Sequence, residues 1–403
     1  MKTLISVFAL LLAIVCASAS RADFVFTQTF IVNTAVPDSG ELADVQTLSL
    51  GGGTVSGISV GLNITSVSDS SPAYIGDYYA AVGHDDGYAV LLNRTGKTSN
   101  DLSDPAAYGS AYEGLNVTFA DSAANGDIHA ASPSDVNNPG TLTGTWAPDG
   151  RETDPAAVLA ADNRTATLAS FNGVSTDGQW RLFVADDSAG GTGRLASWTL
   201  NLTFSPLAAA RITIAANATA TFTTPQTITN TFVVQGVLNG PTTPGEAITF
   251  TGPVSGAGSF HGNFIFDGSY SPGNSPAATI IEGDATFTSG NTLIIELGGT
   301  TPGTGYDTVS VTGQLSLGGT LEIVLINGFE PAPGDIFNII TAGTITGQFD
   351  TVILPDGYTI TGNVASGDSF SLALASIPEP ASCAALLGAV VLGFVACRKR
   401  RHT

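Results

Sequence analysis

The chain has 403 residues, with 13 Lys and Arg against 34 Asp and Glu, which gives a formal net charge of −21. An acidic excess of this size disfavours nucleic acid as a partner, because phosphate groups must be neutralised by cationic side chains. Gly is abundant, at 48 residues, and charged residues make up only 12% of the chain. Because this composition is typical of β-sheets joined by many turns, we expect an all-β protein.

The first 22 residues have the pattern of a secretory signal peptide. Lys2 supplies a positive charge, residues 4–15 are almost entirely apolar, and Ala17-Ser18-Ala19 offers a small-residue cleavage pattern. We therefore expect the chain to be exported through the Sec translocon.

Residues 376–403 combine three features at the extreme C-terminus. Residues 381–397 form an uncharged segment of seventeen residues, and at 1.5 Å per residue such a helix spans about 25 Å, the short end of a membrane crossing. The basic cluster behind this segment is expected on the cytoplasmic side. The motif before the segment and the cluster after it consist of Pro378, Glu379, Pro380, Arg398, Lys399, Arg400 and Arg401.

This order of Pro-Glu-Pro, short apolar span and basic cluster resembles the PEP-CTERM sorting signal of Gram-negative bacteria. The resemblance implies that a membrane enzyme, exosortase, cuts near the Pro-Glu-Pro motif and releases or transfers the protein. We expect an inner-membrane intermediate held by a short C-terminal transmembrane helix, and then a location at the cell surface or outside the cell. The alternative is a plain single-span membrane anchor.

The cysteines and the charge agree with removal of both ends. Cys16, Cys383 and Cys397 lie in the end segments, so a mature chain from Asp23 to Pro380 has neither a disulfide nor a catalytic thiol. Six of the 13 cations leave with the ends and no acidic residue does, which gives 7 − 34 = −27. A surface of this charge attracts divalent cations.

Residues 23–205 show the alternation of half-buried antiparallel strands. Polar or charged residues separate apolar ones along two strands, and turn residues lie between the strands. Short strands with repeated turns predict a β-sandwich of this length. The inward-facing sets are Trp180, Leu182 and Val184 in one strand and Trp198, Leu200, Leu202 and Phe204 in the other.

The motifs of this half resemble the P domain (P/Homo B domain) that follows the catalytic domain of proprotein convertases and many bacterial secreted proteases. A Gly-x-Trp run lies at 178–180, Asp186-Asp187 follows, and a Gly-x-Leu-x-x-Trp-x-Leu run lies at 193–200. The resemblance implies a jelly-roll sandwich that assists a neighbouring serine endopeptidase. The sequence departs from the family at 83–87, where Gly-His-Asp-Asp-Gly replaces a Ser-Pro-x-Gly-Thr turn.

Residues 206–375 follow a different pattern, rich in Gly, Thr and Asn with short alternating apolar runs. Such runs occur at 293–297 and 321–325, and Pro-Gly turns recur at 272–273, 302–303 and 333–334. The segment resembles the β-helical stalks of autotransporter passengers and of other PEP-CTERM surface proteins. We expect a β-helix or β-roll without a strict repeat length. The alternative is a second small β-sandwich.

The sequence offers little for catalysis. The four His residues lie far apart, and the one Gly-x-Ser-x-Gly match, at 57–61, falls in a continuous alternating strand. A nucleophile elbow would need a sharp turn at Ser59. We therefore predict a protein that is not an enzyme.

Calcium is the expected cofactor, because hard cations take oxygen ligands from acidic turns. The P-domain resemblance implies such positions in the first half of the chain. The alternative is that each Asp caps its own turn. The expected ligands are Asp38, Asp77, Asp121, Asp186 and Asp187.

Six Asn-x-Ser/Thr sequons offer possible glycosylation sites in an exported chain. The asparagines of these sequons are Asn63, Asn93, Asn116, Asn163, Asn201 and Asn217.

These observations favour an exported, non-enzymatic surface or matrix protein in which a sandwich is presented on a β-rich stalk. Its partners would be exosortase and extracellular polysaccharide, and its role adhesion or polysaccharide organisation. The alternative is an accessory module for a secreted serine endopeptidase that is supplied by another chain. A third hypothesis, an unrecognised hydrolase, requires a convergent His–carboxylate–Ser cluster.

Overall fold

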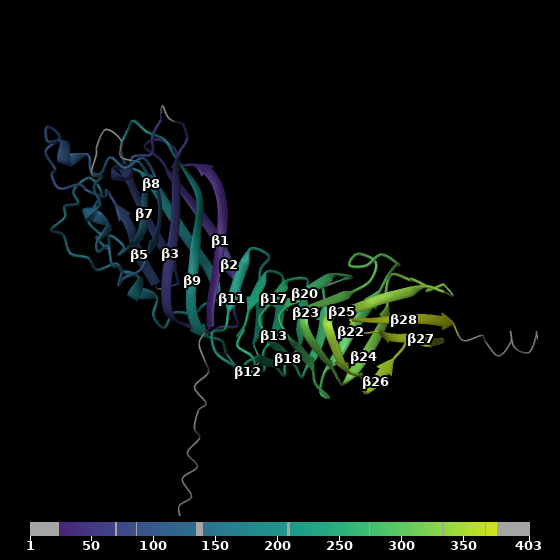
Figure 1. Ribbon diagram of the computed structural model, residues 1–403. Coiled ribbons are helices and arrows are strands. Elements are labelled where there is room, and N and C mark those ends of the chain that lie inside the picture. The colour runs from purple at the N-terminus through teal and green to yellow at the C-terminus, as the bar shows by residue number, and fades with distance from the viewer. Residues whose placement is uncertain are drawn as a thin grey trace, which may run out of the picture.

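The computed structural model describes residues 24–68, 71–85, 87–133, 140–207, 210–273, 275–332, 334–366 and 368–376. The expected signal peptide (1–22) and C-terminal helix (381–397) lie outside these residues. Within the described part, no helix is long and apolar enough to cross a membrane. The predicted all-β class is confirmed, with a two-sheet sandwich at one end and a stack of short strands at the other (Figure 1).

The sandwich consists of a five-stranded and a four-stranded sheet. The first has the order β1-β9-β3-β6-β7, and its bounds are β1 Phe24–Ala35, β3 Thr54–Ser66, β6 Leu115–Phe119, β7 Leu142–Trp146 and β9 Gly193–Ser205. The second has the order β2-β8-β4-β5, with β2 Glu41–Leu48, β4 Tyr78–His84, β5 Gly87–Asn93 and β8 Gly178–Asp186. The connections contain short 3₁₀ turns: η1 Ile75–Asp77, η2 Pro105–Ala107, η3 Ile128–Ala130 and η4 Leu168–Phe171.

The core of the sandwich lies between the two sheets, where the predicted inward faces meet. All seven apolar residues assigned to the inner faces of β8 and β9 are fully buried. Trp198 remains hydrogen-bonded although buried, because its Nε1 donates to Asp44 Oδ2 over 2.7 Å. Burial of two tryptophans in this way contributes a large share of the apolar area removed from water.

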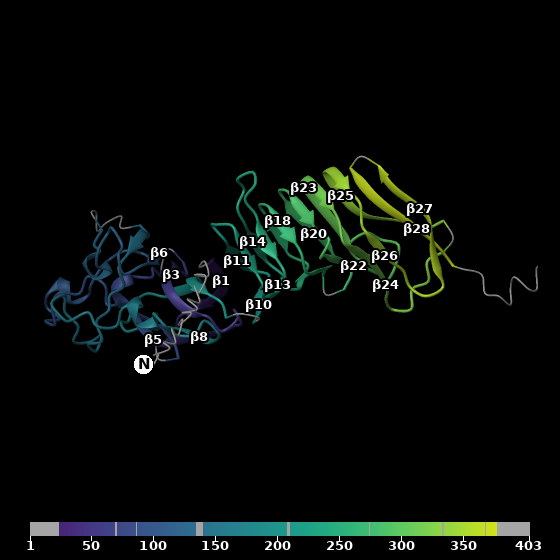
Figure 2. The same cartoon turned by 90° about the horizontal axis from the view of Figure 1, so that it is seen from below.

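The second half is a parallel β-helix, so the alternative of a second sandwich is wrong. Each coil contributes one strand to each of three faces, and strands on one face pair in parallel (Figure 2). The first face holds β10 Arg211–Ile214, β13 Thr231–Val234, β16 Val254–Gly256, β19 Ser269–Pro272, β22 Thr292–Leu297, β24 Thr320–Leu325 and β26 Thr351–Ile353. The second holds β11 Ala218–Thr221, β14 Val237–Asn239, β17 Ser259–His261 and β20 Ala278–Glu282, and the third holds β12 Gln226–Ile228, β15 Ile248–Phe250, β18 Phe264–Phe266 and β21 Ala285–Phe287.

The later coils change shape. The second and third faces merge into the longer strands β23 (Thr308–Leu317) and β25 (Ile336–Gly347), and an antiparallel hairpin of β27 (Tyr358–Ser366) and β28 (Ser369–Ser376) closes the stack. Paired positions lie 20 residues apart at the first step, from Arg211 to Thr231, and 31 apart at the last, from Thr320 to Thr351. This variation is consistent with the predicted lack of a strict repeat length.

Aromatic rings fill the interior of the coils. The Phe266 ring stacks on Tyr270 with centroids 4.6 Å apart and meets Phe287 edge to face at 5.6 Å. The Phe232 and Phe250 rings of the preceding coils continue the series at 5.4 Å. Because inward positions repeat on every coil, neighbouring coils bury one another and the core runs along the axis.

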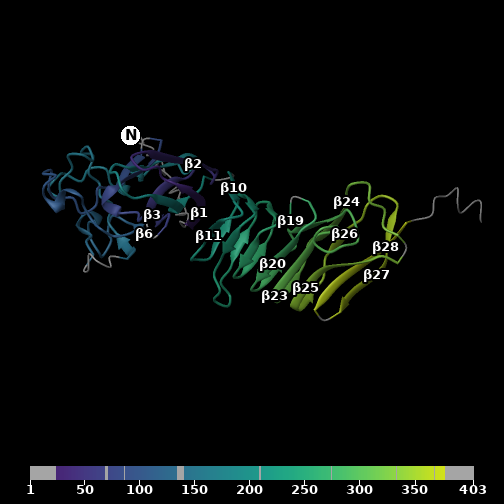
Figure 3. The same ribbon diagram turned by 90° about the horizontal axis from the view of Figure 1, so that it is seen from above.

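One strand belongs to both halves of the molecule. β1 pairs with β9 of the sandwich along one edge and with β11 of the first coil along the other, in antiparallel register from Val25–Thr221 to Gln28–Ala218. Side chains join in, since Gln28 Nε2 donates to Asn217 Oδ1 over 3.0 Å and Asn217 Nδ2 donates to Thr29 O over 2.9 Å. The sandwich therefore covers the open end of the β-helix, and the two parts form one elongated body (Figure 3).

Candidate functional site

Two of the expected calcium ligands lie close together at one end of the sandwich. Asp77 ends η1, Asp186 ends β8, and the Asp187 backbone nitrogen donates to Asp77 O over 2.8 Å. Both carboxyl-bearing side chains are buried, at 8% exposure for Asp77 and 3% for Asp186. Arg94, at the end of β5, places Nη2 4.0 Å from Asp77 Oδ1 and donates from Nε to Gly76 O.

Burial dominates the ionisation of this pair. It raises the pKa of Asp77 to about 6, against the opposing effect of the Arg94 charge and a hydrogen bond from Ser188, while the charge of Asp38 adds to the rise. Burial likewise raises the pKa of Asp186 to about 6, and the charges of Asp77 and Asp38 add to it. Three of the expected ligands therefore act on one another electrostatically.

The other three expected ligands have different surroundings. Asp187 is exposed, as is Asp38. Asp121 accepts hydrogen bonds from the backbone nitrogens of Leu168 and Ala169 at 3.1 and 2.7 Å, so it caps the start of η4. Among the described residues, no group of three or more His, Cys, Asp or Glu side chains is arranged to hold a metal ion. Calcium binding stays a prediction.

A cavity of about 300 Å³ lies beside Asp77. Its walls come from η1 and from the two loops around 108–111 and 188–190, and they carry Tyr74, Tyr108, Ser110 and Ser188 besides Asp77. The remaining lining residues are Gly and Ala. The cavity therefore combines two aromatic rings with a carboxyl and hydroxyl groups.

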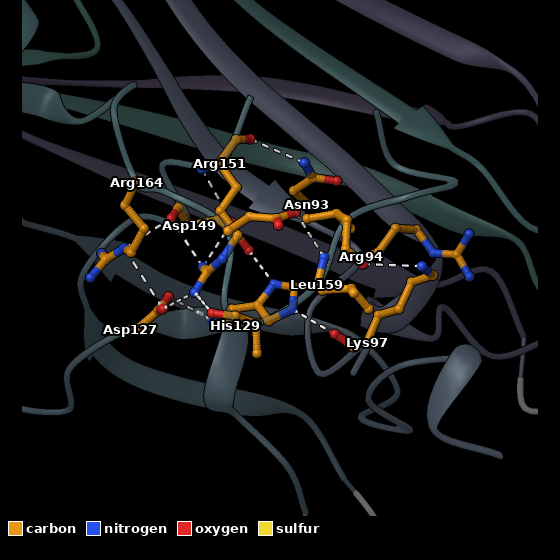
Figure 4. A network of polar contacts seen from close by, with 12 residues as sticks. Asn93, Arg94, Lys97, Asp127, His129, Asp149, Arg151, Leu159 and Arg164 are labelled. Carbon is orange, nitrogen blue, oxygen red and sulfur yellow. Dashed lines mark hydrogen bonds and ion pairs between the residues drawn. The ribbon is translucent and has the colours of Figure 1, made fainter. Parts of the chain in front are cut away.

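A second polar cluster is buried among the loops of the sandwich half and was not expected from the sequence (Figure 4). His129 is 1% exposed and its Nδ1 lies 2.7 Å from Asp149 Oδ2, while its Nε2 lies 2.8 Å from Lys97 O. Burial by itself would lower the pKa of His129, but the hydrogen bond and the charge of Asp149 outweigh it and raise the pKa above its ordinary value. Both neighbours present acceptor oxygens to the ring, so an imidazolium would donate a hydrogen bond to each of them.

Arg151 connects this cluster to the surrounding loops. Its Nη1 donates to Asp149 Oδ1 over 3.1 Å, and its Nη2 donates to Asp127 Oδ2 over 2.8 Å and to Ala160 O over 2.7 Å. Arg164 lies on the outer side, with Nε 3.7 Å from Asp127 Oδ2. Oppositely charged groups alternate through the cluster, as burial of so many charges requires.

Further backbone carbonyls are tied to the same region. Lys97 Nζ donates to Ala156 O and Val158 O at 3.1 and 3.0 Å, and Asn93 Nδ2 donates to Arg151 O and Thr153 O at 3.0 and 2.8 Å. All four carbonyls lie in the long irregular loop over 147–167, and the donor Lys97 lies in the loop over 94–113. The cluster therefore stabilises loops that contain little regular secondary structure.

The described contacts do not assemble a hydrolase site. His129 contacts a carboxylate and a carbonyl, and His84 contacts two carbonyls, Gln179 O at 2.9 Å and Ser175 O at 2.8 Å, while stacking on Trp180. Ser59 lies in the middle of β3, opposite Asn201 of β9, as the continuous alternation predicts. Both rings are buried, at 2% exposure for His84 and 1% for His129.

Sequence reasoning missed Arg94, His129, Asp149 and Arg151. The available signal was that the cations of the mature chain lie only between Arg94 and Arg211. In a chain so poor in cations, such clustering indicates residues retained for specific pairing. The sequence could not reveal the partners, because Lys97, His129 and Asp149 come from three different loops.

Two sequence families match the chain. The proprotein convertase P-domain matches residues 151–202, which contain η4, β8 and most of β9. The PEP-CTERM protein-sorting motif matches residues 376–401. A comparison with curated proteins gives no match.

Among solved structures, a similarity was found to the crystal structure of the Aeromonas sobria serine protease in complex with its chaperone. The two chains are 14% identical, and the alignment covers 46% of this chain and 27% of the other, with a TM-score of 0.24. The alignment thus spans about a quarter of that chain. The two family matches confirm the resemblance seen in the sequence, that of a PEP-CTERM protein with a P domain.

Proposed function

We propose that this chain is an exported, non-enzymatic surface or matrix protein that displays its P-domain-like sandwich at the far end of a β-helical stalk. The observation that carries the proposal is the position of the two matched segments. The sorting-motif match begins at Ser376, where β28 ends, and the sandwich lies at the opposite end of the body (Figure 1).

The structure of the stalk is suited to a spacer between the C-terminal tail and the sandwich. Its coils are joined by continuous parallel ladders, and the pairing of β1 with β11 extends one sheet of the stalk into the sandwich. In a solenoid of this kind each coil contacts its neighbours in a fixed register, so the two ends of the stack are held at a set distance from each other. Processing by exosortase near Pro378–Pro380 would then leave the sandwich facing outward, for adhesion or for association with extracellular polysaccharide.

The proposal is tested by fractionating cells that produce the chain with an epitope tag inserted in the exposed loop near Gly245. We expect the tagged chain at the cell surface or in the extracellular polysaccharide, and release of the chain when the polysaccharide is digested. A chain that stays in the cytoplasm, or one whose distribution does not change when the polysaccharide is removed, would contradict the proposal.

The P-domain match supports a second candidate, an accessory module for a secreted serine endopeptidase on another chain. Cross-linking on intact cells, followed by identification of the captured protein, separates the two candidates. Repeated capture of one secreted endopeptidase, with loss of its activity when this chain is deleted, favours the second. Unchanged endopeptidase activity favours the first.

A further inference from the structure

The cavity beside Asp77 is held open by backbone contacts. Gly76 N donates to Ser110 O over 3.0 Å and Ser110 N donates to Thr95 O over 2.7 Å, which fixes the 108–111 loop against η1. Gly109 lies between these elements with φ +78°, and a Cβ on it would meet Thr95 O at 2.7 Å. The cavity is therefore largely formed before any ligand arrives, which reduces the entropic cost of binding.

The carboxyl of Asp77 is the main polar anchor in the wall of the cavity. Arg94 Nη2 lies at 4.0 Å, beyond hydrogen-bond distance, because its Nε is engaged by Gly76 O. The Ser188 hydroxyl bonds to the same carboxyl from the opposite loop. An acceptor flanked by a hydroxyl is a suitable partner for vicinal hydroxyl groups of a ligand.

Two tyrosines provide the apolar part of the cavity. Tyr108 is 54% exposed although aromatic, and its hydroxyl donates to Leu102 O over 3.1 Å, which fixes the ring at the rim. Tyr74 lies on the η1 side and is half-buried. An exposed ring beside convergent polar groups matches a molecule with one apolar face and hydroxyl groups around its edge.

We propose that this cavity binds a neutral hexose unit of an extracellular polysaccharide, with a tyrosine face against the ring and Asp77 and Ser188 bonded to hydroxyl groups. The volume of about 300 Å³ is at the lower end for small-molecule sites and fits one sugar ring. An anionic sugar is disfavoured, because Asp186 and Asp187 lie beside Asp77 and the chain between the expected cleavage sites has an excess of acidic residues. The inference rests on the proposed association with polysaccharide and names its chemistry.

The test uses the full chain purified from an exporting bacterial host and the methyl glycosides of glucose, galactose and mannose as probes. Saturation-transfer NMR and calorimetric titration should show millimolar binding of at least one of them and no binding of glucuronic acid. Tyr108→Ala and Asp77→Asn should each weaken binding at least tenfold. Tyr88→Ala, which removes an exposed tyrosine elsewhere on the sandwich, should leave binding unchanged.

Three results would overturn the inference. The first is no binding of any of the three glycosides at about 10 mM, and the second is binding that survives both Tyr108→Ala and Asp77→Asn. The third is binding that requires added calcium, since the carboxyl would then serve a metal. Circular dichroism of each variant confirms that it is folded. Because defined sugars and purified protein are used, a negative result here leaves the surface location of the chain to be judged by fractionation.

Discussion

Arg151 offers the sharpest test of what stabilises the loops of the sandwich. Its guanidinium is 4% exposed and bonds to Asp149, Asp127 and Ala160 O. Replacing it by Met keeps much of the apolar stem but leaves two carboxylates with fewer cationic partners. Removing one partner of a buried ion pair costs about 3–5 kcal/mol, a large part of the 5–15 kcal/mol that is typical for a whole domain.

Tryptophan fluorescence measures this loss selectively. All three Trp residues lie in the sandwich half, and Trp180 and Trp198 are fully buried. In urea, we expect Arg151→Met to lower the midpoint of the fluorescence transition by on the order of 2 M, given a dependence of about 2 kcal/mol per M. The urea midpoint of Arg151→Lys should fall between those of the unchanged protein and of Arg151→Met, because an ammonium group retains the charge but not the planar geometry.

The matched control is Arg181→Met, which removes an exposed arginine from β8. Exposed substitutions of this kind usually change stability by less than about 0.5 kcal/mol. If Arg151→Met and Arg181→Met cost the same, the reasoning is refuted. The cluster would then be a set of solvated charges rather than a support for the loops.

Three further predictions concern the rest of the molecule. Burial raises the pKa of Asp307 in the stalk to about 7, so the folded state binds an extra proton between about pH 7 and 3.8, and stability should increase by about 2–3 kcal/mol from pH 8 to pH 5. Thermal unfolding of Asp307→Asn should lose this increase, and an unchanged pH profile would contradict the assignment. Asn217→Ala should destabilise the junction by about 1–2 kcal/mol and speed amide exchange in β11, whereas exposed Asn163→Ala should not, and equal exchange in both variants would argue against the shared strand. If the sequons are used, glycopeptide mapping should find Asn163 modified but never Asn93, whose amide nitrogen donates to Arg151 O and Thr153 O.

The strand pattern could be predicted where alternation is strong. Burial of Trp180 and Trp198 follows directly from the period of two in β8 and β9, because every second side chain points into the core. Leu293, Ile295 and Leu297, which alternate with partly exposed positions along β22, are likewise fully buried. The parallel β-helix was favoured by its Gly-rich, weakly charged coils.

The junction and the polar sites could not be predicted in the same way. Pairing of β1 with β11 joins residues nearly 200 positions apart, and nothing in the local pattern of Gln28 or Asn217 indicates the partner. The approach of Asp77 and Asp186 depends on the pairing of β4 with β8, which places Tyr78 opposite Asp186. The same holds for Tyr108 and Ser110, which acquire their surroundings only in three dimensions.

The central claim is that a folded all-β body is exported and then separated from its C-terminal tail. The most direct measurement is the intact mass of the chain recovered from the cell surface and the medium of its native host, with both terminal peptides sequenced. The account predicts a C-terminus near Pro380, with any added mass identifying an attached group. A chain that still ends at Thr403 in the membrane fraction would contradict it.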